Sequence, residues 1–122
     1  MPRILSVSRN PQLLATRNDA LALAGYSVAS PKEPLDAIAQ FARSPFDAVV
    51  IGHSVEPELR QRLIGGLRAL APRVPIVFAH PFGVEEEPLA DVTVDTAEDP
   101  FAIVVALDKL LKRADRGEAT YS

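Results

Sequence analysis

The residues whose types could support chemistry stand directly after short apolar runs of the chain, and they are Ser8, Arg9, Asn10, Gly52, His53, His80, Asp95 and Thr96. His53 and His80 are the only histidines, and such a pair could bind a metal ion or transfer protons. Because side chains alternate along a strand, His53 is expected on the other side of the sheet from His80. No third ligand is evident, so we expect His80 to fill space by hydrogen bonding and expect no metal.

Arg9, His80 and Thr96 could instead form a cationic pocket for a phosphate or a carboxylate, helped by backbone N–H groups at the start of the next helix. The competing interpretation is that Arg9 simply pairs with a carboxylate of this chain, Asp95 or Asp47. The second interpretation is the one we favour.

Ser8 with His80 also permits a hydrolase interpretation. However, the chain has no Gly-x-Ser-x-Gly turn to expose a nucleophile, and no acid is placed to orient the histidine. We therefore do not expect an enzyme.

The elements that must position these residues alternate along the chain. Strand-like apolar runs lie at residues 4–7, 26–29, 48–51, 76–79 and 92–94, and helical patterns lie at 11–24, 31–43, 56–71 and 100–113. This alternation predicts an α/β fold in which a doubly wound, five-stranded parallel sheet is covered on both faces. In such sheets ligands bind at the carboxyl ends of the strands, where the residues above stand.

Local signals set the expected helix boundaries. Asn10 before Pro11 predicts a capped helix start, and Gly25 predicts its end. Ser30 and Glu33 have the spacing of a capping box for the second helix. Asp99 before a proline predicts the start of the last helix by the same logic.

Other polar groups have simpler interpretations. Solvent-exposed positions are expected for Glu85, Glu86 and Glu87 and for Arg60, Arg62, Arg68 and Arg73. Gly65 and Gly66 lie inside the third helix, where each glycine costs about 1 kcal/mol relative to alanine. Such a cost indicates that a neighbour approaches the helix closely there.

The composition excludes several classes of protein. The 122 residues suffice for one domain, and 48% hydrophobic with 24% charged residues is typical of a globular protein. A net charge of -3 argues against nucleic-acid binding, and the absence of cysteine excludes disulfides and thiolate metal sites. No apolar run is long enough to span a membrane and no signal-peptide pattern occurs, so we expect a cytoplasmic protein.

Over residues 2–113 the chain resembles the response-regulator receiver family. Residues 4–11, 46–52, 74–80 and 95–101 are similar to its first strand and acidic turn, its third strand, its fourth strand and its last strand-to-helix junction. The resemblance implies a flavodoxin-like receiver fold for residues 1–113, followed by a polar tail at residues 114–122.

The chemistry of that family is a separate matter. The resemblance implies an aspartate that accepts a phosphoryl group, two acidic residues that hold Mg²⁺, a Thr or Ser, and a Lys. The corresponding positions here are, in that order, Gly52, then Ser8 and Arg9, then His80, then Thr96. Every one departs from the pattern, so we expect a degenerate pocket with no phosphorylation, no metal and no cofactor.

The stretch between residues 80 and 96 is shorter than the family's by about one and a half helical turns. Two prolines, a glycine and three successive glutamates make it a poor helix. We expect the fourth helix of the receiver fold to be shortened or lost, which remodels the face that receivers use for output.

These expectations define a stand-alone, degenerate receiver-like domain that acts in signalling by binding a protein partner. The alternative is a small-molecule or anion sensor that uses the strand-end pocket around Arg9 and His80. The last helix is apolar at every position from 101 to 107, more than one buried face explains. Phe101, Val104 and Val105 are therefore candidates for an interface, either of a homodimer or with another protein.

Overall fold

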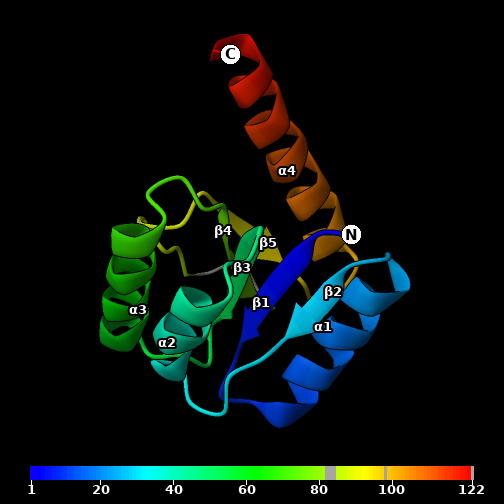
Figure 1. The fold of residues 1–122 in the computed structure, drawn as a ribbon. Coiled ribbons are helices and arrows are strands. Elements are labelled where there is room, and N and C mark those ends of the chain that lie inside the picture. Colours follow the sequence, from blue (N-terminus) through cyan, green and yellow to red (C-terminus); the bar gives the residue numbers. More distant parts are fainter. Residues whose placement is uncertain (82–84, 98, 122) are drawn as a thin grey trace.

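The computed structural model describes residues 1–81, 85–97 and 99–121, with side chains as far as residue 113. In this part of the chain, strands and helices alternate (Figure 1). The strands are β1 (Arg3–Val7), β2 (Ser27–Ala29), β3 (Ala48–Gly52), β4 (Ile76–His80) and β5 (Val92–Asp95). The helices are α1 (Pro11–Leu23), α2 (Asp36–Arg43), α3 (Pro57–Leu70) and α4 (Ala102–Tyr121).

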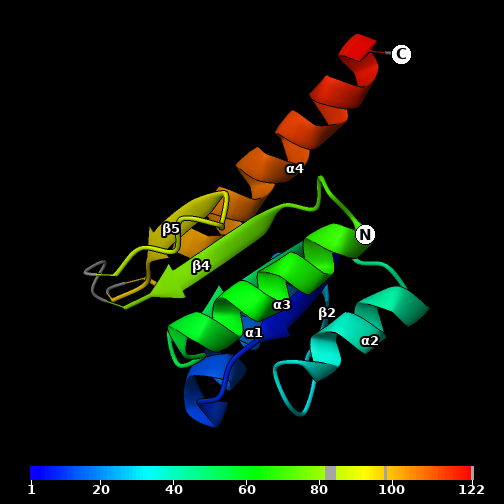
Figure 2. The same ribbon diagram turned by 90° about the vertical axis from the view of Figure 1, so that its left-hand side faces the viewer.

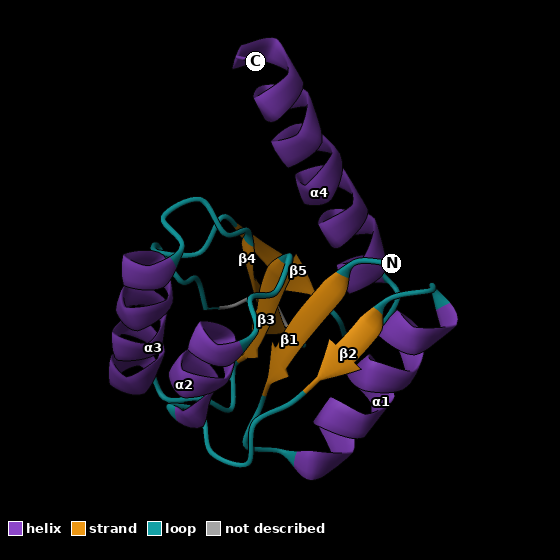
Figure 3. Cartoon of the chain, viewed as in Figure 1, coloured by secondary structure: helices purple, strands orange, loops and turns teal. Residues whose placement is uncertain are grey.

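The five strands form one parallel sheet with the order β2-β1-β3-β4-β5. Every residue of β3 and β4 is buried, because these strands lie inside the sheet and are covered on both faces. Figure 3 shows the sheet between two layers of helices. The predicted doubly wound α/β fold with five parallel strands is confirmed.

Side chains that alternate along the strands build two separate cores. One core joins the sheet to α2 and α3 and includes Leu5, Val7, Phe41, Val49, Ile51, Leu63, Leu67 and Ile76. The other joins the sheet to α1 and α4 and includes Ile4, Leu21, Val50, Val77, Val94, Ile103 and Leu107. Figure 2 shows α2 and α3 next to each other on the first face of the sheet. No helix of the described residues is both long enough and apolar enough to cross a membrane.

The signals at the first helix are confirmed. The Asn10 side chain accepts hydrogen bonds from the backbone N–H groups of Gln12 (3.0 Å) and Leu13 (3.1 Å). Gly25 follows the helix with φ of +92°, a conformation that residues with a Cβ rarely adopt.

The predicted capping box of the second helix is wrong. Helix α2 begins only at Asp36, after Leu35, and no side chain caps it. The physical reason is Pro34, which lacks the N–H that a helix starting at residue 31 needs and disfavours helical geometry at Glu33.

One of the two glycines of α3 lies close to a neighbouring side chain, as predicted. A Cβ built on Gly66 would lie 2.5 Å from Cδ1 of Ile38 on α2, whereas Gly65 has nothing within 4 Å. Gly66 therefore lets α2 pack directly against α3.

The expected loss of the fourth receiver helix agrees with the structure. Residues 81 and 85–91 between β4 and β5 contain no helix, and residues 82–84 of this stretch lie outside the described part. Ala90 packs against the core of α2 and α3, so the connecting segment itself covers that end of the sheet.

Helix α4 differs from the expectation at both ends. It begins at Ala102 rather than residue 100, because the Asp99 carboxylate accepts the Phe101 N–H at 2.9 Å and holds the preceding residues in a turn. It continues to Tyr121 rather than ending at residue 113, so residues 114–121 of the predicted polar tail are helical (Figure 1). Residue 122, the last of the predicted tail, lies outside the described part.

Candidate functional site

An arginine that the sequence analysis did not name lies at the carboxyl ends of β1 and β3, beside Gly52. The Arg17 side chain reaches from α1 to the end of β1, where Nη1 donates to Ser6 Oγ (3.1 Å) and to the Val7 carbonyl (3.0 Å). Its Nη2 lies 2.6 Å from the position that a Cβ on Gly52 would take. The guanidinium therefore fills the space into which a side chain at residue 52 would project.

Arg17 is only 6% exposed, and burial lowers its pKa to about 10. It remains a cation at neutral pH. A signal for its position does exist in the sequence, because Leu13, Arg17 and Leu21 recur every four residues and so share one face of α1. Leu21 is fully buried on that face, which directs Arg17 toward the sheet as well.

Two hydroxyl groups lie at the end of β1. Ser8 Oγ lies 2.9 Å from Ser54 Oγ, and Ser54 Oγ also accepts the Arg9 N–H at 2.9 Å. Ser8 Oγ further accepts the Asn10 N–H at 3.0 Å. Ser8 and Ser54 thus tie the loop after β1 to the loop after β3, and neither brings a negative charge to the site.

Arg9 does not join the other predicted pocket residues. Its partner is Glu33 at 3.8 Å, in an exposed ion pair, so the expected pairing with Asp47 or Asp95 is wrong. Asp47 instead accepts the Arg3 N–H (2.7 Å), and Asp95 accepts the backbone N–H of residue 97 (2.9 Å). Both carboxylates are satisfied by backbone groups near their own strand ends.

The two histidines lie together, contrary to the argument from strand alternation. The ring centroids of His53 and His80 are 4.9 Å apart. His53 follows the last residue of β3 and lies in a turn, where the alternation of the pleat no longer applies. His80 is 7% exposed, and its Nε2 lies 3.8 Å from Glu85 Oε2. Within the described residues, no group of three His, Cys, Asp or Glu side chains is arranged to hold a metal ion.

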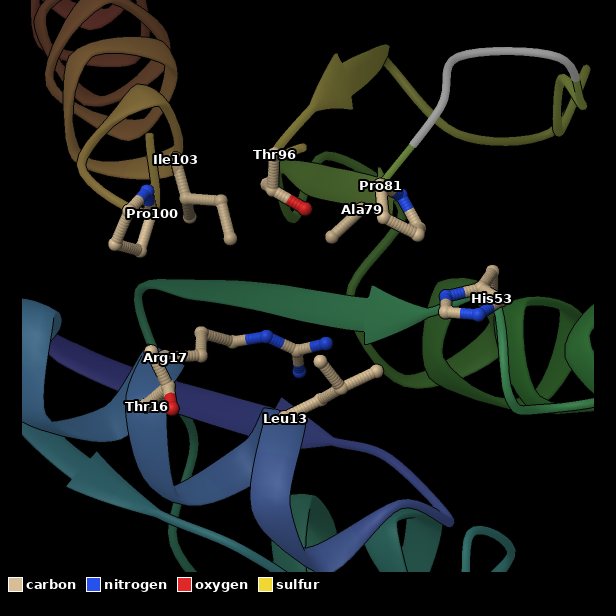
Figure 4. A pocket seen from close by; sticks show the side chains of 9 residues that line it. All are labelled: Leu13, Thr16, Arg17, His53, Ala79, Pro81, Thr96, Pro100 and Ile103. Atoms are coloured by element: carbon tan, nitrogen blue, oxygen red, sulfur yellow. The ribbon is translucent and has the colours of Figure 1, made fainter. Parts of the chain in front are cut away.

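Thr96 lines a cavity together with Arg17 (Figure 4). The cavity has a volume of about 80 Å³ and lies between α1, the ends of β3 and β4, and the first turn of α4. We call it the Arg17 cavity, and its lining residues are Leu13, Thr16, Arg17, His53, Ala79, Pro81, Thr96, Pro100 and Ile103. Arg9 lines a different cavity, together with Pro31 and Glu33.

A second buried arginine forms ion pairs with the segment between β4 and β5. Arg60 on α3 is 1% exposed and pairs with Glu85 (2.6 Å) and Glu87 (3.1 Å). It also donates to the Val55 carbonyl (2.8 Å) and lies over the Phe78 ring, 4.3 Å from its centroid. The expectation that Arg60, Glu85 and Glu87 are solvated is therefore wrong, because together they form a largely buried cluster.

The exposure of the last helix agrees with the expectation. Phe101 is 43% and Val105 is 55% exposed, whereas Val104 is half-buried. The role of Phe101, Val104 and Val105 in an interface stays a prediction.

The environment of His53 gives a testable pH dependence. Burial lowers the pKa of His53, and His80, Arg17 and Arg60 lower it further, while Glu85 acts in the opposite direction. The unfolded chain therefore binds this proton more tightly, so His53 contributes stability above about pH 6.5 that is lost as the pH falls through its folded pKa. We expect the free energy of unfolding to fall on acidification, and to fall less in His53→Asn. Urea unfolding at neutral and mildly acidic pH measures this free energy for both proteins. An equal decrease on acidification in the wild type and in His53→Asn would show that His53 is not the group responsible.

Comparison with known proteins gives a clear result for the fold alone. No protein-family profile matches the sequence. No curated protein matches it either. A receiver domain protein from Methanospirillum hungatei has a similar structure, with a TM-score of 0.82 at 15% identity, covering 96% of this chain and 98% of that one. The signal receiver domain of a LuxO-type repressor from Vibrio parahaemolyticus gives 0.81 at 14% identity, covering 99% and 98%.

A response regulator receiver protein from Sinorhizobium medicae is similar as well, with a TM-score of 0.77 at 20% identity over 91% of this chain and 94% of that one. These matches and the strand order agree in describing one architecture, and the described residues between β4 and β5 depart from it by containing no helix. The chain has the CheY-like receiver fold.

Proposed function

We propose that the chain is a receiver-like signalling module that works without phosphorylation, without Mg²⁺ and without catalysis, by binding another protein. The observation that carries the proposal is the pair formed by Gly52 and Arg17. The position of the receiver's phosphoacceptor holds no side chain, and a guanidinium occupies the adjacent space. A cation at this point, with Ser8 and Arg9 at the positions where the resemblance implies two acidic residues, opposes the binding of a divalent metal.

Treatment with acetyl phosphate and Mg²⁺ is expected to leave the mass of the protein unchanged. A phosphorylatable receiver treated in parallel shows that the donor is active. Intact-mass spectrometry is the measurement, and an added phosphoryl group on Asp47 or Asp95 would contradict the proposal.

Millimolar Mg²⁺ is expected to leave the melting temperature of the protein unchanged. A ligand that binds only the folded state must raise the melting temperature, so a rise with Mg²⁺ in a thermal unfolding experiment would contradict this expectation.

The exposed face of α4 is the surface on which we base the partner. Phe101, Val105, Asp108 and Lys112 follow one another at intervals of four and three residues and so share one face of the helix. Asp108 and Lys112 form an exposed ion pair at 3.0 Å. This face carries both charges beside two exposed apolar side chains, which makes it complementary to itself. We propose that its occupant is a second copy of the chain, related by a two-fold axis.

Light scattering at tens of micromolar protein is expected to show a dimer that Val105→Glu converts to a monomer. The matched control is Leu23→Glu on α1, where a leucine that is 79% exposed lies on a different surface. This variant is expected to remain dimeric. A monomeric native protein that Val105→Glu leaves unchanged would eliminate the second copy as the occupant of this face.

A further inference from the structure

Arg17 differs from the other buried arginine in having no acidic partner. Arg60 is paired with two glutamates, whereas Arg17 contacts only the neutral oxygens of Ser6 and Val7. Burial is the single cause that lowers its pKa, and no carboxylate of the described residues offsets it. A buried cation without a counter-charge is costly to the folded state. That cost is recovered when an anion binds.

The donors that remain on Arg17 have the geometry of an anion-binding fork. A guanidinium has five N–H groups, and both N–H groups of Nη1 are used by the protein. Nε and Nη2 have no acceptor in the described part of the chain. Two parallel N–H groups on one edge of a guanidinium are the arrangement that binds both oxygens of a carboxylate.

The Arg17 cavity lies beside this side chain. Figure 4 shows Arg17 extending from α1 along one side of the cavity, with Thr96 and Ile103 on the opposite side. Thr16, His53 and Thr96 bring further polar groups to the lining. The rest of the wall is apolar and comes from Leu13, Ala79, Pro81, Pro100 and Ile103.

Charge and size select the class of ligand. One cation matches a monoanion better than a phosphate dianion, and the apolar wall matches a short hydrocarbon tail. A cavity of 150 Å³ binds benzene, so about 80 Å³ corresponds to an anion of acetate or propionate size. The remaining atoms of such a ligand can extend through the side of the cavity that is open to solvent.

We propose that the Arg17 cavity binds a short-chain monocarboxylate, with its oxygens on the Nε and Nη2 edge of Arg17 and its tail against Leu13, Pro100 and Ile103. Arg17 thereby takes the role that the sequence suggested for Arg9. The inference is independent of the proposed dimer, because Val105 and the outer face of α4 are not part of the cavity.

Titration with sodium propionate, followed by two-dimensional NMR at constant ionic strength, tests the proposal. We expect saturable shifts at residues around the cavity with a dissociation constant in the millimolar range. Acetate is expected to bind about fourfold more weakly, because it lacks one buried methylene group. Inorganic phosphate is expected to bind more weakly than propionate.

Two variants and one control make the test specific. Arg17→Gln, checked for a dispersed native spectrum, is expected to weaken propionate binding at least tenfold, and Arg9→Gln is expected to leave it unchanged. Leu13→Ala alters a side chain that is already 42% exposed, so it is expected to fold and to reduce the preference for propionate over acetate. Absence of saturation, equal binding by Arg17→Gln, or tighter binding of phosphate than of propionate would each overturn the proposal.

Discussion

Replacing Arg60 by methionine is expected to lower the free energy of unfolding by about 3–5 kcal/mol. The reason is Glu87, which is 3% exposed and would keep a buried charge without a counter-charge. Arg68→Met on the same helix is the matched control. Arg68 pairs with Asp91 at 3.0 Å, but both side chains are about one-third exposed, and such pairs contribute less than about 1 kcal/mol. Urea unfolding measures both variants, and similar losses would show that Arg60 is not a buried structural cation.

A second variant separates the ion pairs from the packing of the Arg60 side chain. Adding Glu87→Gln to Arg60→Met removes the stranded charge, so the double variant is expected to be more stable than Arg60→Met alone. If the double variant is no more stable, the loss comes from the contact between Arg60 and Phe78 rather than from the carboxylate.

Gly52→Ala is expected to cost about 1–3 kcal/mol of stability through Arg17 rather than through the strand. The new Cβ would approach Nη2 to 2.6 Å, so the guanidinium must move and lose its bonds to Ser6 and Val7. In an Arg17→Ala background the same substitution is expected to cost much less, because the space is empty. Unfolding free energies of the wild type, the two single variants and the double variant form the cycle. Additive effects would show that Gly52 and Arg17 do not compete for one space.

Much of the architecture can be predicted from local patterns in the amino-acid sequence. The apolar, β-branched run at residues 48–51 is typical of a strand buried on both faces, and Asn10 before Pro11 is typical of a helix start; the structure confirms both. The five-stranded α/β sheet and the absence of a helix from the described residues between β4 and β5 follow from such signals. The sequence pattern predicts the last helix too short, because residues 114–121 are mostly polar and carry no apolar periodicity. Residues 114–121 contain no proline, and helix formation does not require an apolar face at every turn.

The candidate site was harder to predict, because it depends on two long cationic side chains whose partners are distant in sequence. Arg17 and Arg60 each share a helix face with buried leucines, a pattern visible in the sequence. A charge on such a face is usually assigned to solvent, and only the fold shows that Gly52 leaves space for one arginine and residues 85–87 supply acids for the other. Arg9 was the more obvious candidate, yet it lies outside the Arg17 cavity and pairs with Glu33.

Helix α4 is long enough for a small rotation at its base to move its far end by several ångströms. Its 20 residues span about 30 Å, and Figure 1 shows the far end projecting well beyond the sheet. Pro100 and Ile103 at its base form part of the wall of the Arg17 cavity. A tilt of about 10° at that base would displace the far end by about 5 Å over this length. Any tilt of α4 at the wall of this cavity would therefore be largest at the far end of the helix, away from the sheet.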